Sequence, residues 1–545
     1  MELLSLKYLL FVLILLILYY GLPLLRSSVR KYQWMVLLAG SLGYYAMQDV
    51  RHILFLLLTS FTVWAGADRI GKIHEVYKTE KKAAGLTREE KKALKKLYDT
   101  KSRRVLFGVL FLNFGILAYL KYWVVLLNVL RGGGAASLIL PLGISFYTFQ
   151  ATSYILDVHG SKYGPEKNYA KFLLFVSYFP QLLQGPIGRY PQIGNQLTEQ
   201  RAFDRKTAGE GVLLILYGLM KKYAVADMLA PLIAEVLDGP VDGIPGSMLA
   251  FIILLYSAQQ YADFSGGIDI ISGVSLLFGV RLAPNFRQPY FATSLGDFWR
   301  RWHISLGAWM RDYVFYPFAL TKPMQELGKK IIAAGNYEEK AKKERAKHLG
   351  RVIPAAIANI LVFFLVGIWH GAELHYVLWG LYNGIVIALS DILEPVWKIP
   401  GSSSAEKGAA VNTERALSHV LRVFRTFLIV NIGWYFDRIT DVHKCWDSLK
   451  ATFFRFAPYA FSASFRQELL TTRDAFTVYG SLALAMICVM AVFVISVLRE
   501  RGKEPELYLM KHPAVYAFSA FVMVTLTTAS FLFAESAGGF MYANF

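Results

Sequence analysis

The chain has 545 residues, of which 55% are hydrophobic and 15% aromatic, and its formal net charge is +19. Its mean hydropathy of +0.39 is too high for a soluble enzyme of this length, so we expect an all-α polytopic membrane protein. The two cysteines, Cys445 and Cys488, lie far apart, which argues against a disulfide framework and against a thiolate metal site.

Stretches of about 20 apolar residues predict the membrane-spanning helices. The first stretch has its basic flank after it and no small-residue cleavage site, so we interpret it as a retained anchor and not as a signal peptide. Two shorter crossings are predicted at 34–47 and 53–67. The remaining predicted spans, with the first, are 6–25, 104–129, 170–184, 211–237, 248–278, 352–370, 376–393, 417–435, 479–497 and 514–533.

Two runs rich in lysine and glutamate, 69–104 and 321–351, supply much of the positive charge. Basic segments between spans stay in the cytoplasm, which fixes the predicted topology; binding of an acidic partner or of anionic membrane lipid is the alternative role. Neither run lies in a nucleic-acid recognition module, so nucleic acid is not an expected partner. This topology predicts an extracytoplasmic segment at 437–474.

The stretch "DFWRRWHISLGAWMRDY", residues 297–313, is unusually polar for such a chain. Its acids and arginines follow a region broken by glycines at 266, 267 and 273 and prolines at 284 and 289, so we expect an interrupted, non-straight segment. Irregular backbone at membrane depth requires a cavity or a protein interior, which predicts a polar tunnel or re-entrant bowl. Alternatively, the charged side chains form ion pairs that seat short helices in the headgroups: Asp297, Arg300, Arg301, Arg311 and Asp312.

His370 is an isolated titratable residue at the end of the apolar run "NILVFFLVGIWHG". A neutral imidazole can take a proton from a hydroxyl and give it to a thiolate leaving group, as a general base in acyl transfer does; a packing role is the alternative. His375 stands five residues away, on another helix face, so a metal pair is not expected. The predicted topology places His303 near the inner face and His370 toward the outer face, at opposite depths of the membrane.

Five motifs carry a resemblance to a known family. They are "PLGISFYTFQATSYILDV" (141–158), "FVSYFPQLLQGPIGRY" (175–190), "YADFSGGIDIISG" (261–273), "NFRQPYFATSLGDFWRRWHISLGAWMRDYVFYP" (285–317) and "GIWHGAELHYVLWGLYNG" (367–384). Together and in this order they resemble the membrane-bound O-acyltransferase family, in particular its bacterial branch concerned with alginate O-acetylation and D-alanyl transfer to lipoteichoic acid.

The resemblance implies a helical bundle with re-entrant helices around a transmembrane tunnel. His370 matches the principal catalytic histidine and His303 the second characteristic polar position. By the same resemblance Arg300, Arg301 and Arg311 would hold the phosphate-bearing part of the donor or its carrier, and Asp297, Trp302 and Trp369 would complete the substrate site. The sequence departs from the best-known members in "YADFSGGID", where a tyrosine commonly follows the first glycine, and in the long basic segment before residue 352.

The resemblance further implies a division into N-terminal spans at 1–136, a catalytic core at 137–395 and C-terminal spans at 396–545. The extra C-terminal spans favour acetyl transfer from a cytoplasmic thioester, acetyl-CoA or an acyl carrier, toward an extracytoplasmic polysaccharide. No bound cofactor is expected, and a separate exported acetyltransferase would take the acetyl group on. D-alanyl transfer to teichoic acid from a carrier protein is the second interpretation, and a non-enzymatic transporter or flippase the third. The expected location is the bacterial cytoplasmic membrane.

Overall fold

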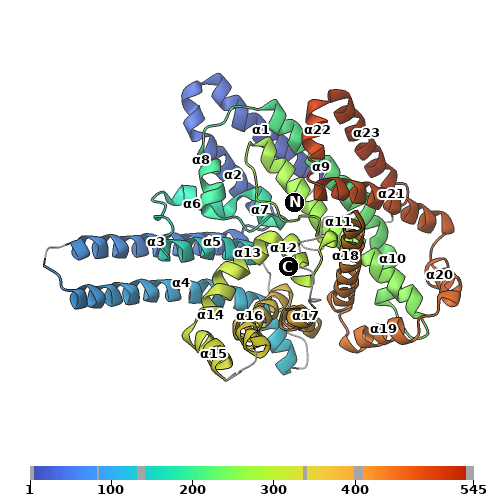
Figure 1. Cartoon of the computed structure of the whole chain (residues 1–545). Helices are drawn as coiled ribbons and strands as arrows, with labels where there is room; N and C mark the ends of the chain where they lie inside the picture. The colour runs from blue at the N-terminus through green and yellow to red at the C-terminus, as the bar shows by residue number, and fades with distance from the viewer. Residues whose placement is uncertain (1–4, 83–84, 132–140, 335–339, 398–408, 535–545) are drawn as a thin grey trace. The chain divides into compact units, whose positions relative to one another are not determined.

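The computed structural model describes residues 5–82, 85–131, 141–334, 340–397 and 409–534 (Figure 1). These residues fold into helices and contain no β-strand, which confirms the all-α prediction. Contacts divide the chain into two compact units. The described residues of the first come from Met1–Ile215 and Ile268–Ala283, and those of the second from Leu216–Gly267 and Pro284–Gly538.

The first unit contains the long helices α3 and α4, which lie side by side (Figure 1). The basic run 69–104 is not an open loop, because α3 extends to Lys82 and α4 starts again at Arg88. The other helices of this unit surround a core rich in buried tyrosine and phenylalanine. The helices are α1 (Leu6–Leu25), η1 (Ser27–Tyr32), α2 (Gln33–Ala46), α3 (His52–Lys82), α4 (Arg88–Arg131), α5 (Ile144–His159), α6 (Tyr169–Ser177), α7 (Phe179–Gln184), α8 (Tyr190–Thr198) and most of α9 (Arg205–Lys221).

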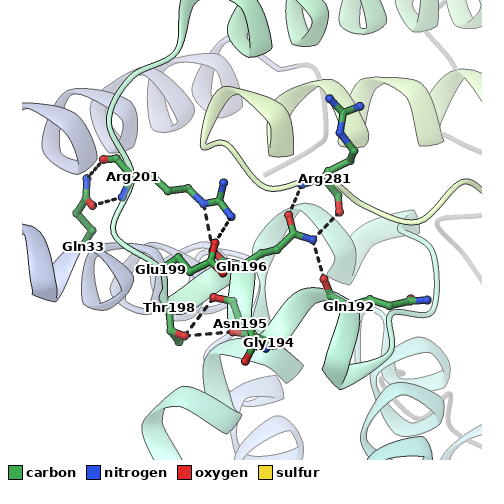
Figure 2. A network of polar contacts seen from close by, with 9 residues as sticks. All are labelled: Gln33, Gln192, Gly194, Asn195, Gln196, Thr198, Glu199, Arg201 and Arg281. Carbon is green, nitrogen blue, oxygen red and sulfur yellow. Dashed lines mark hydrogen bonds and ion pairs between the residues drawn. The ribbon is translucent and has the colours of Figure 1, made fainter.

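Two glutamines in the first unit hold irregular backbone in place (Figure 2). The Gln33 amide donates to the Arg201 carbonyl at 3.0 Å, and its oxygen accepts from the Arg201 N–H at 2.9 Å. Gln196 makes the same pair of bonds to Arg281, at 3.1 and 3.0 Å. Each glutamine therefore satisfies a donor and an acceptor that the loop backbone leaves without a helical partner.

Gln33→Leu is expected to destabilise the protein measurably, because Gln33 is buried and its amide also donates to the Tyr19 carbonyl at 3.0 Å. Unsatisfied buried polar groups cost about 1–3 kcal/mol each, so the thermal midpoint of detergent-purified protein should fall by several degrees. The exposed Gln200→Leu serves as the control. Equal midpoints for the two variants would contradict this role.

The second unit contains the C-terminal half of the chain. Its helix α11 runs without a break from Gly246 to Leu277 and continues into the first unit, so the predicted interruption at Gly266, Gly267 and Gly273 is wrong. A Cβ atom on Gly266 would lie 2.9 Å from the Gly218 carbonyl oxygen, so this glycine permits close approach to α9. The helices are η2 (Lys222–Ala226), α10 (Asp227–Asp238), α11 (Gly246–Leu277), η3 (Pro289–Phe291), α12 (Leu295–Arg301), α13 (Ile304–Met310), η4 (Arg311–Phe315), α14 (Tyr316–Ala319), α15 (Lys322–Ala333), α16 (Lys340–His370), α17 (Leu374–Trp397), α18 (Ala409–Arg438), α19 (Val442–Phe454), η5 (Pro458–Ala460), α20 (Phe461–Leu469), α21 (Ala475–Glu500), α22 (Pro505–Lys511) and α23 (Pro513–Ser530).

Most predicted spans coincide with helices, but the span predicted at 170–184 is wrong. The chain there forms two short helices, α6 and α7, separated at Tyr178, whose backbone leaves the helical region with φ of −51° and ψ of 110°. Within the described residues, seven helices are long and apolar enough to cross a membrane, so the protein is an integral membrane protein. They are Leu6–Leu25, His52–Lys82, Arg88–Trp123, Lys342–His370, Leu374–Glu394, Ala475–Glu500 and Pro513–Ser530.

Candidate active site

His370 is the last residue of α16, and its position is set by close packing of α16 against α17 (Figure 1). A Cβ atom on Gly367 would collide with the Tyr376 carbonyl oxygen, and one on Gly380 would collide with the Phe363 carbonyl oxygen. The two backbones therefore approach more closely than ordinary side chains allow. This contact fixes the end of α16, and His370 with it, against the first turns of α17.

Aromatic rings surround the buried His370 imidazole. The rings of Trp369 and Trp379 meet it edge to face, with centroids 5.0 and 4.9 Å away, and the Tyr376 ring stacks at 6.0 Å. Such a site restricts the imidazole to few orientations and keeps bulk water away from it. Both conditions favour controlled proton transfer.

His375 has a different environment from His370. Its Nδ1 donates to the Phe436 carbonyl at 2.8 Å, and its ring lies 3.9 Å from the Tyr376 ring. The hydrogen bond joins the start of α17 to the end of α18. His375 therefore fastens two helices together; it lies on α17, whereas His370 ends α16, so the two histidines do not share one helix as their spacing suggested.

His303 lies between α12 and α13 with φ of +45°, a left-handed conformation that is uncommon for a residue with a side chain. Asn285 holds it there. The Asn285 side-chain oxygen accepts from His303 Nδ1 at 3.3 Å, from the Ser305 N–H at 3.0 Å and from the Ser305 hydroxyl at 2.9 Å. The Asn285 carbonyl accepts from the Ile304 N–H at 3.0 Å.

The bond to Asn285 places the His303 proton on Nδ1 and leaves Nε2 with its lone pair. Nε2 is buried and has no hydrogen-bond partner among the described residues. His303 lies outside the seven candidate spans, and burial lowers the pKa of its imidazole to about 3. The ring is therefore neutral at physiological pH, with Nε2 available to accept a proton or a hydrogen bond.

The two histidines do not lie at opposite depths of the membrane, so that prediction is wrong. The His303 ring centroid is 6.0 Å from the Trp369 ring, which in turn is 5.0 Å from the His370 ring. One indole thus separates them, whereas the hydrocarbon core is about 30 Å thick. Trp369, predicted to bind substrate, lies buried between the two candidate catalytic residues.

A cavity of about 840 Å³ is lined by three arginines, Arg287, Arg300 and Arg311, and by Ile304, the residue after His303; neither candidate catalytic histidine lines it. Trp299 forms part of its wall; the indole N–H donates to the Asn383 side-chain oxygen at 2.9 Å, and the ring packs on Trp379 at 5.5 Å. Because Trp379 also contacts His370, two indole rings that meet edge to face lie between the cavity and the His370 imidazole. The cavity combines positive charge with an apolar wall. Its other lining residues are Pro284, Phe286, Ser294, Gly296, Ile304, Gly307, Ala308, Phe315, Tyr316, Asn359, Val362, Phe363, Ile387, Ser390 and Asp391.

Of the predicted substrate-binding residues, Arg300 and Arg311 line the cavity. Arg301 does not; it donates to both oxygens of Glu500 at 3.0 and 2.8 Å and pairs with Asp297 at 3.1 Å. Trp302 is buried, with its ring stacked on Phe298 at 5.5 Å. Arg301, Asp297 and Trp302 therefore support the segment that carries Arg300 and His303.

Several residues of the site were not among those predicted from the sequence. Arg287 lies in the quoted motif "NFRQPYF", so its charge was visible beside the prolines. Asp391 stands in a predicted span, where an ionisable residue is itself a signal of function. Asn285, Trp299 and Asn383 carried no such signal, because their roles depend on contacts between distant segments.

A buried histidine pair, an arginine-lined cavity and several membrane-spanning helices define an integral membrane enzyme of group transfer. The chain belongs to the membrane-bound O-acyltransferase family, and residues 3–333 match the sequence model of that family. It is therefore an O-acyltransferase. The matched range includes His303 and the three arginines and ends before His370.

Three relatives illustrate the range of the family. The chain is 31% identical to a protein of Pseudomonas aeruginosa described as a probable alginate O-acetylase, AlgI, over 78% of this chain and 71% of that protein. It is 28% identical to the peptidoglycan O-acetyltransferase of Helicobacter pylori, over 57% of this chain and 56% of the relative. It is 26% identical to the teichoic acid D-alanyltransferase of Bacillus subtilis, over 47% of this chain and 60% of the relative.

Proposed function

We propose that the protein moves an acetyl group from a cytoplasmic thioester across the bacterial cytoplasmic membrane, for O-acetylation of an extracytoplasmic polysaccharide. The descriptions of its relatives support the acyl group and the acceptor class: those with about 30% identity are described as probable alginate O-acetylases. The basic segments support the direction, because positively charged connections stay on the cytoplasmic side.

The observation that carries this proposal is the arginine-lined cavity, whose wall includes Ile304, next to His303 in the chain, and Trp299, which packs through Trp379 toward His370. Coenzyme A and carrier-bound pantetheine both carry phosphate, which arginine binds through paired, charge-assisted hydrogen bonds. With the phosphates held by Arg287, Arg300 and Arg311, the apolar wall would face the thioester arm. The thioester would then reach the histidines past Trp299 and Trp379.

In the proposed reaction the acceptor oxygen forms a bond to the thioester carbonyl carbon, and the carbon–sulfur bond breaks. His370 takes the proton from the acceptor hydroxyl and returns it to the departing thiolate, so the imidazole ends the cycle neutral. His303 Nε2 supplies a second acceptor in the same aromatic compartment. The expected partners are the donor, the surrounding lipid and an exported acetyltransferase or glycan that receives the acetyl group.

D-alanyl transfer from a carrier protein is the second candidate, supported by the lower identity to teichoic acid D-alanyltransferases. Sealed membrane vesicles of both orientations distinguish the two functions and the direction. Inverted vesicles supplied with radiolabelled acetyl-CoA, which does not cross membranes, should release free CoA and retain label. Right-side-out vesicles given the same acetyl-CoA should release no CoA and retain no label. Inverted vesicles given D-alanyl-charged carrier should not consume the carrier. Vesicles containing His370→Ala protein give the background.

Use of D-alanyl carrier in place of acetyl-CoA would establish the second candidate. Equal use of acetyl-CoA by intact vesicles of both orientations would contradict a cytoplasmic donor site.

A further inference from the structure

A second cavity, of about 620 Å³, lies in the second unit and has an almost entirely apolar lining. It is formed by side chains of α11, α18 and α21, together with η3, η2 and the start of α10. Its volume falls in the range of small-ligand sites. It shares no lining residue with the arginine-lined cavity.

This apolar cavity opens between side chains that face outward. Leu254, Phe424, Met486 and Phe493 line it and remain 44%, 58%, 50% and 50% exposed, respectively. One wall, α21, is among the candidate membrane spans. In the membrane these side chains meet hydrocarbon, so the chemistry that fits the cavity is a hydrocarbon chain.

Two arginines of α18 lie near the apolar cavity without lining it. Arg422 and Arg425 are exposed on α18, next to the lining residues Val420, Val423 and Phe424. Arg422 donates to the Ser418 carbonyl at 3.2 Å, and Arg425 to the Thr293 carbonyl at 3.1 Å. Neither arginine contacts an acidic side chain in the described part of the chain.

Two acids near Arg425, Asp297 and Glu500, are already paired with another arginine. The Asp297 carboxylate accepts from the Thr293 N–H and pairs with Arg301, which also binds Glu500 at the end of α21. Through Thr293, Asp297 and Arg301, these contacts connect Arg425 of α18 to the last turn of α21. Arg422 and Arg425 therefore keep positive charges that no acid of the described residues pairs with.

We propose that the apolar cavity binds one acyl chain of an anionic phospholipid from the surrounding membrane, with the lipid phosphate held by Arg422 and Arg425. Basic side chains beside transmembrane helices attract anionic headgroups, and guanidinium groups bind phosphate through two parallel hydrogen bonds. The lining is mostly apolar, with Ser257, Gln288 and Ser496 as its few polar members, so an acyl chain would meet chiefly hydrocarbon side chains there.

A lipid bound in the apolar cavity would contact Tyr290, which connects to His303 through a series of packed aromatic rings. Tyr290 lines the apolar cavity, and its ring packs on Phe427 at 5.3 Å and on Trp302 at 6.3 Å. Trp302 contacts Phe264, whose ring lies 4.9 Å from His303. Lipid binding in this cavity does not depend on which acyl group the enzyme transfers.

Native mass spectrometry of the full-length protein tests this proposal, with dioleoyl phosphatidylglycerol and dioleoyl phosphatidylcholine added to delipidated, detergent-purified protein. The wild type should retain phosphatidylglycerol about tenfold or more over phosphatidylcholine, since each arginine near an anionic headgroup contributes appreciably. The double variant Arg422→Gln/Arg425→Gln should lose this preference. Arg466→Gln is the matched control, because Arg466 is also exposed and also donates to a carbonyl one turn earlier.

Ala258→Trp, which fills the apolar cavity, should abolish retention of both lipids, whereas Ala517→Trp on the exposed face of α23 should not. Val489→Phe provides a milder filling variant if Ala258→Trp is not monodisperse. Equal binding of the two lipids by the wild type would overturn the proposal. Retention of phosphatidylglycerol by a folded filling variant would overturn it as well.

Discussion

Replacing His370 with alanine should reduce acyl transfer by about 10²- to 10⁴-fold, the usual contribution of a general base. His370 ends α16 inside an aromatic compartment, and the alanine leaves the Gly367–Gly380 contact that positions this helix end unchanged. Folded protein should therefore be recovered in near-normal yield. The measurement is release of CoA thiol per folded molecule, normalised to the monodisperse fraction.

His375→Ala is the informative control, because it removes a neighbouring buried histidine that has a different task. Its loss leaves the Phe436 carbonyl without its 2.8 Å donor, so the variant should lose about 1–3 kcal/mol of stability and keep most activity per folded molecule. If His303 serves the same proton path, the double variant His303→Ala/His370→Ala should be little worse than His370→Ala alone. Full activity of His370→Ala would remove the proposed mechanism.

Reversing the charge of a cavity arginine should raise the donor concentration needed for half-maximal rate by roughly tenfold to 100-fold, the value of one or two charge-assisted hydrogen bonds. Arg300→Glu and Arg311→Glu are the variants of choice, because both side chains line the cavity. Arg300 is 69% exposed, and its ion pair with Asp297 has an N–O distance of 3.4 Å. An exposed ion pair contributes little to stability, so folding should tolerate the change. Arg300→Lys should have a smaller effect in the same direction.

Arg301 provides the matched comparison for Arg300. It is only 14% exposed and is bound to Asp297 and Glu500, so Arg301→Gln should lower the thermal midpoint and leave the apparent donor affinity unchanged. Steady-state kinetics on both variants, with acetyl-CoA varied, separate the two roles. An unchanged KM for the donor in Arg300→Glu, with a reduced maximal rate, would show that the arginine-lined cavity does not hold the donor.

Arg300 and Arg301 show how far the sequence could predict the site. Composition placed both in one polar stretch, and the resemblance to a family assigned both to the donor. Their roles differ because consecutive helical residues point about 100° apart and because the partner of Arg301, Glu500, lies 199 residues further along the chain. The sequence around Arg301 contains no information about a salt-bridge partner that lies so far along the chain.

The relative depth of His303 and His370 failed as a prediction for a related reason. Counting charges assumed that each segment between basic runs either crosses the membrane or stays at one face. The short helices α12 and α13 have seven residues each, about 10 Å of rise, and the left-handed turn at His303 lets the chain fold back beside Trp369. The long spans were predictable because hydrophobic length alone determines them, as α1 at Leu6–Leu25 illustrates.

The close crossing of α16 and α17 restricts which sequence changes the protein can accept. Because Gly367 and Gly380 lock the two backbones together, one residue inserted between Gly367 and His370 would turn the imidazole by about 100° around the helix axis, away from Trp379. An insertion near 335–339, before α16 begins, leaves that register untouched. Length variation should therefore accumulate in the basic segment and be absent from the three residues that lead into the histidine.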